Sequence, residues 1–210
     1  MGDILQNPAQ EVHHRTRADL TLALIGAIGL AIAVGIAYFF AAQLSLALLA
    51  EPDGVALFWP AAGVSSGVLI VALGRDARLP VAGGVMVATI IANLAGDRNV
   101  WSATAFAFCN AGEALFAAWL IERYFGSPFS LDRLRNVLGL LAVAAVATGA
   151  SGVGGAVAFK LFHSPTAPIW TTWHHWFASD VVGIITVAPL VIGLAEAVRV
   201  RRATRSSRAS

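Results

Sequence analysis

Charged residues are scarce in this sequence. Of its 210 residues only 12% are Asp, Glu, Lys or Arg, whereas 58% are hydrophobic. A soluble domain normally carries about a quarter charged residues, so water is not the only solvent of this chain. The sequence also lacks the short segments of alternating polarity that indicate a transmembrane barrel. Long apolar runs recur instead, and they predict an all-α, polytopic membrane helix bundle.

Residues that carry covalent or metal chemistry are also few. The single cysteine, Cys109, cannot form an intrachain disulfide and matches no metal-ligand spacing. The glycine-rich run 148–155 lacks the Lys-Ser/Thr end of a phosphate loop, and its small residues predict tight helix packing or a dimer face. No nucleophile stands beside a base. We therefore expect a protein that is not an enzyme and has no metal site, and the sequence implies no cofactor.

Six apolar segments predict six transmembrane helices. Their expected limits are 20–49, 55–73, 79–95, 101–121, 134–159 and 172–198. About 20 helical residues cross the hydrocarbon core, so the first, fifth and sixth segments must tilt, bend or extend past the lipid. The chain then divides into an N-terminal cytoplasmic tail (1–19), the transmembrane bundle (20–198) and a basic cytoplasmic tail (199–210).

The arginines predict the orientation of these spans. If both termini are cytoplasmic, twelve of the fourteen Lys and Arg residues lie inside, and only Arg98 and Lys160 lie outside. Cytoplasmic loops collect Lys and Arg, so this distribution favours an even number of spans, with outer loops at 50–54, 96–100 and 163–171. Membrane orientation also accounts for the basic balance, and we expect no nucleic-acid partner.

Two acidic residues, Glu113 and Asp180, fall inside predicted spans. An Asp at the centre of a membrane helix costs about 2.5–3.5 kcal/mol, and such residues usually face the bundle interior. At 1.5 Å per residue, Glu113 lies about 18 Å and Asp180 about 12 Å below the outer surface. The two carboxyls can therefore share a pocket if their helices are neighbours. We predict a polar ligand pocket lined by Asn93, Asn110, Glu113, Trp173, Trp176 and Asp180.

The polar pocket has a simpler alternative. Buried Asn, Glu and Asp side chains often serve only as hydrogen-bonding contacts between helices, and the tryptophans then act as interfacial anchors.

Two prolines suggest mechanical roles. Trp59 and Pro60 open the second span, where a proline suits the first helical turn because it needs no N–H partner. Pro189 lies inside the sixth span and is expected to kink it, which predicts a hinge between Asp180 and the basic tail. The alternative is that Pro189 only shapes helix packing.

Four stretches resemble the membrane-associated sensor domain MASE1. They are FWPAAGV at 58–64, ANL at 92–94, NAGEA at 110–114, and the sixth-span series Trp173, Trp176, Asp180, Gly183 and Pro189. The resemblance covers most of residues 20–198. It implies a multi-pass bundle of the bacterial inner (cytoplasmic) membrane, of the kind that precedes histidine kinases and diguanylate cyclases.

Three functions follow as hypotheses. The first is a sensor that couples a periplasmic or lipid-phase stimulus to a cytoplasmic output domain. The second is an accessory subunit of a photosynthetic or respiratory membrane complex, because no kinase or cyclase motif follows Arg199; a pigment or lipid could then be bound. The third is a transporter that uses Glu113 and Asp180. The expected partners are the lipid bilayer and an output domain or other membrane subunits. A homodimer is a further alternative.

Overall fold

The computed structural model of the protein describes residues 8–47, 49–50, 55–71 and 75–207. Within these residues the chain forms six helices: α1 (Pro8–Leu46), α2 (Pro60–Val71), α3 (Arg75–Ala95), α4 (Val100–Phe125), α5 (Leu134–Phe162) and α6 (Ile169–Ser207). Two short antiparallel strands, β1 (Leu49–Ala50) and β2 (Val55–Ala56), pair between α1 and α2. The prediction of a polytopic helical membrane bundle is confirmed.

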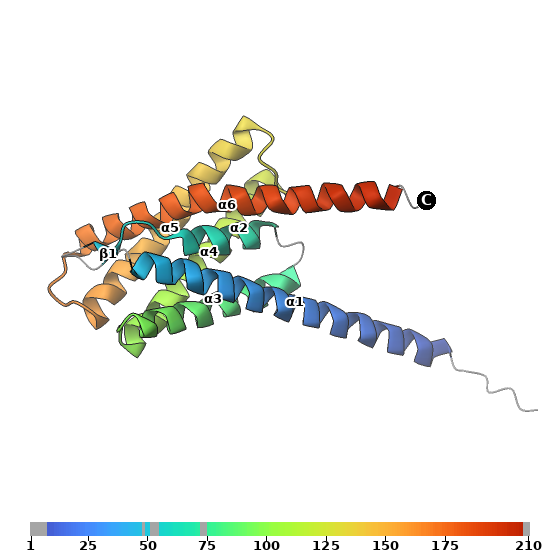
Figure 1. Cartoon of the computed structure of the whole chain (residues 1–210), viewed down its shortest axis with the longest axis horizontal. Helices are drawn as coiled ribbons and strands as arrows, with labels where there is room; N and C mark the ends of the chain where they lie inside the picture. Colours follow the sequence, from blue (N-terminus) through green and yellow to red (C-terminus); the bar gives the residue numbers. More distant parts are fainter. Residues whose placement is uncertain (1–7, 48, 51–54, 72–74, 208–210) are drawn as a thin grey trace, which may run out of the picture.

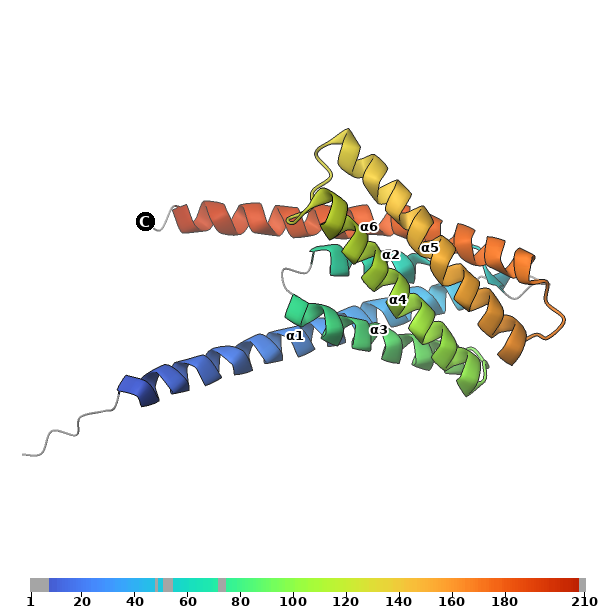
Figure 2. The same cartoon turned by 180° about the vertical axis from the view of Figure 1, so that it is seen from behind.

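The helices run back and forth between two ends of the bundle (Figure 1). The start of α1 and the close of α6 lie at the same end, and Figure 2 shows the same arrangement from behind. We call this the basic end, because Arg78, Arg123, Arg133, Arg135 and Arg199 lie there. We call the other the tryptophan end, after Trp59, Trp101, Trp170 and Trp173. Trp and Tyr gather at membrane–water interfaces, so this segregation fits a bundle that crosses the bilayer.

Five of the six helices in the described residues are long and apolar enough to cross a membrane, and α2 is the exception. The second predicted span, 55–73, is helical only from Pro60 to Val71. Twelve residues extend about 18 Å, short of the roughly 30 Å hydrocarbon core. The residues before Pro60 are extended, and the N–H of Trp59 donates to the carbonyl of Ser179 (3.2 Å). Non-helical backbone is tolerated at membrane depth only where protein surrounds it in this way.

The ends of the outer helices also differ from the predicted limits. Helix α1 begins at Pro8 rather than near residue 20, and α6 continues to Ser207 rather than closing near residue 198. Helix therefore extends into both predicted tails, which contain the good helix formers Arg and Ala, and in the first tail also Glu and Gln. The predicted cytoplasmic placement of these tails stays a prediction.

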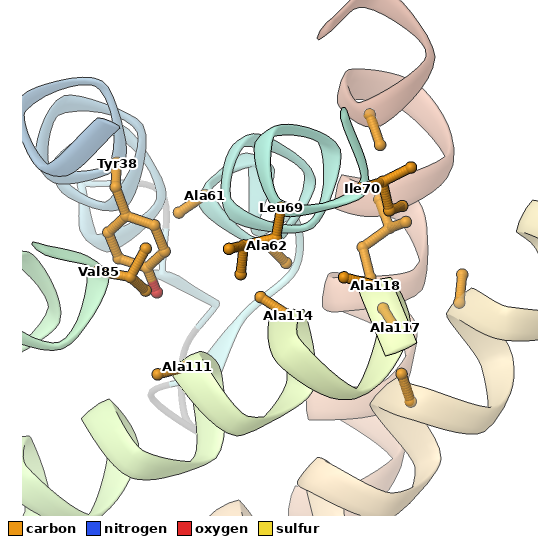
Figure 3. Close-up of a cluster of buried hydrophobic side chains, with 14 of the residues drawn as sticks. Tyr38, Ala61, Ala62, Leu69, Ile70, Val85, Ala111, Ala114, Ala117 and Ala118 are labelled. Atoms are coloured by element: carbon orange, nitrogen blue, oxygen red, sulfur yellow. The ribbon is translucent and has the colours of Figure 1, made fainter. Parts of the chain in front are cut away.

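Helix α2 is the centre of the core. Nine of its twelve residues are buried. Figure 3 shows Leu69 and Ala62 of α2 facing the alanines of α4, among them Ala114 and Ala118. The small alanine side chains let α4 approach α2 closely. The same view places Tyr38 of α1 beside Ala61 of α2 and close to Val85 of α3.

Glycines bring α2 into backbone contact with α6. A Cβ added at Gly183 would lie 2.0 Å from the carbonyl oxygen of Trp59, and one at Gly63 would lie 2.2 Å from the carbonyl oxygen of Gly183. Lipid tails give helices no hydrophobic reason to associate, so close packing of small residues supplies much of the attraction. At the basic end, the guanidinium of Arg199 donates to the carbonyl of Val71 (3.1 Å), one of the last carbonyls of α2, which the helix cannot pair itself.

We predict that Gly183→Ala destabilises the protein. The new methyl group would collide with backbone, which cannot rotate away, and overpacking of this kind costs about 1–3 kcal/mol or more. The midpoint of thermal unfolding in a mild detergent should fall. Gly193→Ala is the matched control on the same helix, because a Cβ there would meet nothing within 4 Å. Equal midpoints for the two variants would contradict the packing described.

Candidate functional site

A small cavity lies at the tryptophan end, where α2 begins. Its volume is about 50 Å³, and one water needs about 10–15 Å³, so it can hold a few waters or a group of similar size. Residues from α1, β2, α3, α4, α5 and α6 line it, together with Trp59 and Arg98. The lining residues are Leu46, Ala56, Trp59, Asn93, Arg98, Phe106, Asn110, Phe159, Trp176, Ser179 and Asp180.

The carboxyl groups of Glu113 and Asp180 meet beside this cavity. Both side chains are only 3% exposed, and they are hydrogen-bonding neighbours across α4 and α6. The hydroxyl of Ser151 on α5 donates to Glu113, and that of Ser179 donates to Asp180 Oδ1 (3.2 Å). Two contacting carboxyls away from water repel unless they hold a proton between them. The contact between the two carboxyls therefore joins α4 to α6, and the Ser151 hydroxyl joins α5 to them.

The two predicted asparagines both line the cavity, but their side chains differ in hydrogen bonding. The amide nitrogen of Asn93 donates to the carbonyl of Thr89 (2.8 Å), so its side chain is held by its own helix. The side-chain oxygen of Asn110 is buried and has no hydrogen-bond partner among the residues that the structure describes. Buried polar atoms are normally paired with protein or with ordered water, so Asn110 offers an acceptor to whatever occupies the cavity.

The two tryptophans that were predicted to line the pocket lie in different places. Trp176 lines the cavity and lies edge-on to Phe106, with ring centres 5.2 Å apart. Trp173 lies outside the cavity, where its ring stacks between those of Trp170 and Phe177. Its Nε1 donates to the carbonyl of Gly149 (3.0 Å).

The small-residue run on α5 packs against these tryptophans within the same chain. A Cβ at Gly155 would lie 2.6 Å from the Trp176 ring, and one at Gly152 would lie 3.2 Å from the Trp173 ring. Of the two interpretations of the run 148–155, tight packing is what these two glycines provide.

Glu113 does not line the cavity itself but contacts Asp180, which does. It borders a separate groove of about 310 Å³ between α4 and α5, together with Cys109, Gly112, Ser151 and Gly154. The carboxyl pair thus stands between the cavity and this groove. Of the six predicted pocket residues, four line the cavity, Glu113 is behind Asp180, and Trp173 is elsewhere.

The predicted start of the second span also belongs to the site. Trp59 lines the cavity, and its Nε1 donates to the hydroxyl of Tyr38 (3.4 Å). Pro60 begins α2 as expected. Helix α6 runs unbroken through Pro189 (Figure 1), so the expected hinge at this proline stays a prediction.

Sequence reasoning missed Tyr38, Arg98 and Ser151. Tyr38 lies inside an apolar run, and Ser151 lies in a run of small residues that indicated packing. Arg98 lies in a predicted outer loop, where a charge needs no buried partner. The available signal was its isolation, since it is one of two basic residues at an end that otherwise lacks them.

Arg98 gives the mouth of the cavity a positive charge. Its guanidinium lies 5.6 Å from the ring centres of both Phe106 and Phe159, and burial lowers the pKa of Arg98. His163 follows α5 nearby, with its ring centre 4.9 Å from that of Phe159. Burial, and then the charge of Arg98, lower the pKa of His163.

The lowered pKa of His163 predicts a loss of stability in acid. The unfolded chain binds the proton at the ordinary value near 6.5, above the folded value. Protonation therefore favours unfolding as the pH falls through about 6.5 toward the folded pKa. In His163→Gln the decline in unfolding midpoint between pH 7.5 and pH 5.5 should be smaller than in the wild type. Identical declines would show that His163 contributes nothing to it.

The contact between Glu113 and Asp180 predicts that their substitutions are not additive. Glu113→Leu and Asp180→Leu each leave the other carboxyl without its neighbour, so the double variant should cost less than the sum. The expected interaction free energy is about 0.5–3 kcal/mol. The control cycle combines Glu113→Leu with Glu196→Leu, because Glu196 is exposed on α6. Additive effects in the first cycle would contradict the contact.

A family comparison agrees with the resemblance noted in the sequence. The MASE1 family model matches residues 28–209, a range that includes the whole cavity and the carboxyl pair. No curated protein and no solved structure gives a significant match. The family match covers nearly the whole chain, and five of its helices can span a membrane. The protein is therefore a multi-pass membrane protein that belongs to the MASE1 family of membrane-associated sensor domains.

Proposed function

We propose that the protein receives a stimulus at the cavity of the tryptophan end and passes it along α6 to a cytoplasmic output domain. One observation carries this proposal. Asp180, which lines the cavity and contacts Glu113 of α4, stands on a continuous helix that reaches Ser207 at the basic end. A change at Asp180 thus acts on the same rigid element that leaves the bundle.

The stimulus must favour one arrangement of the bundle over another. A ligand that binds two arrangements equally shifts neither. The cavity supplies groups for such a preference, because the acceptor oxygen of Asn110 and the Asp180 carboxyl face it from different helices. A ligand, or a change in the shared proton, that draws Asp180 toward or away from Glu113 would move α6 relative to α4.

The proposal also includes an orientation and a location. The basic end faces the cytoplasm and the tryptophan end faces the periplasm or the outer lipid, in a bacterial inner membrane. The support is the distribution of basic residues, twelve of fourteen toward one side. In this scheme the protein catalyses no reaction itself, and its partner is the output domain.

A fusion to a diguanylate cyclase or histidine kinase output domain tests the proposal. Asp180→Asn and Glu113→Gln keep the size of each side chain but remove its titrating proton. Allosteric coupling of typical strength corresponds to about 5–150-fold, so each variant should change basal output at least about fivefold. Glu196→Gln, on the exposed face of α6, is the control and should leave output unchanged.

Unchanged output in both carboxyl variants, with unfolding midpoints like the wild type, would contradict the sensor proposal. Purification of the unfused chain in mild detergent tests the alternative that the protein is an accessory subunit. Co-migration with a large pigmented or haem-bearing complex would support an accessory subunit instead.

A further inference from the structure

A second hollow lies at the other end of the molecule, between α4 and α5. This groove has a volume of about 810 Å³, within the roughly 300–1,000 Å³ of small-molecule sites. Its walls are apolar, and Leu134, Leu138 and Val146 on α5 are 73%, 55% and 54% exposed. Figures 1 and 2 show the start of α5 standing away from α6 at this end. The groove therefore opens toward the lipid rather than into the bundle.

One arginine, Arg135, lines this groove, and a second, Arg123, precedes the lining residue Tyr124. Arg135 donates to the carbonyl of Tyr124 (3.3 Å), and its guanidinium lies 5.5 Å from the centre of the Phe125 ring. The guanidinium of Arg123 lies 5.6 Å from the centre of the Tyr124 ring. Tyr124, Phe125 and Arg135 all line the groove. Stacking on aromatic rings holds a guanidinium in place and leaves N–H donors along its edge.

The start of α5 adds a further preference for anions. Arg133 precedes the helix and its side chain makes no capping hydrogen bond, and free N–H groups at a helix start attract anions. One acid opposes this. Asp132 is exposed in the same loop and accepts a hydrogen bond from Ser130 (2.5 Å).

A similar groove elsewhere shows what is particular to this one. Between α1 and α3 lies a groove of about 830 Å³, lined by residues such as Ile32, Phe40 and Val87, with no charged residue in its wall. Both grooves can hold an acyl chain. Of these two grooves, the α4–α5 groove has an arginine, Arg135, in its apolar wall, so it can distinguish an anionic head group from a neutral one.

We propose that the α4–α5 groove binds an anionic phospholipid. The phosphate lies between Arg123 and Arg135, and an acyl chain follows Leu138 and Val146 along α5. Arginine forks match phosphate geometry, and basic pockets between membrane helices bind anionic head groups. This inference goes beyond the proposed sensor function and does not depend on it.

Native mass spectrometry of the purified full chain tests the proposal. The protein is incubated with equimolar phosphatidylglycerol and phosphatidylcholine, and the retained lipids are counted. One arginine near a membrane surface favours anionic lipid about fivefold, so two predict a preference well above fivefold. Arg123→Gln with Arg135→Gln should abolish the preference. Arg201→Gln, an exposed arginine on α6, should leave it unchanged, and Asp132→Asn should increase it.

Equal retention of the two lipids by the wild type would overturn the proposal. So would a preference that survives in the double arginine variant, or one that Arg201→Gln reduces as strongly. If the double variant does not fold, the wild-type ratio and the increase in Asp132→Asn decide the question, since neither requires the loss of an arginine.

Discussion

The backbone contact between α2 and α6 is the constraint on which the rest of the structure depends. Gly63 and Gly183 let the twelve-residue helix α2 lie directly on α6, which has 39 residues. Because α2 begins only at Pro60, no helix among the described residues fills the space at the tryptophan end between α1, α3, α4 and α6. The extended segment before Pro60 and the cavity take that space. The short central helix thus leaves room at the tryptophan end for a cavity that is lined by side chains of the surrounding helices.

The residues around that space explain how a buried acid is tolerated. Asp180 faces protein rather than lipid, and Glu113, Ser151 and Ser179 supply its surroundings from three helices. Lone acids in hydrocarbon are costly, but a carboxyl pair that holds one proton carries a single negative charge and satisfies part of its own hydrogen bonding. The same residues join the helices of the bundle, because the carboxyl pair and the Ser151 hydroxyl form contacts between α4, α5 and α6.

The sequence predicted the fold better than the site. Long apolar runs bounded by arginines predicted the positions of five spans. The stretch FWP at 58–60 is apolar whether it is helical or not, so only Pro60 indicated where α2 begins. The number of helical residues before Glu113 and Asp180 predicted similar depths below the outer surface, because the rise per residue is constant in a helix. It could not separate Trp173 from Trp176, since which face of α6 meets the cavity depends on where α5 packs. Arg98 was not predicted to line the cavity, because a charge in a loop has no energetic cost that would indicate a buried partner.

The course of α6 shows how a local change could travel. At the tryptophan end α6 contacts α4 and α5, through the carboxyl pair and through Trp173 and Trp176. Farther along it lies on α2, and Arg199 joins it to the close of that helix. The start of α5 meanwhile stands apart (Figure 2). Helices packed this closely shift between discrete arrangements rather than deform continuously. In the proposed mechanism, a displacement of Asp180 against Glu113 would carry α6 and α2 together toward the basic end.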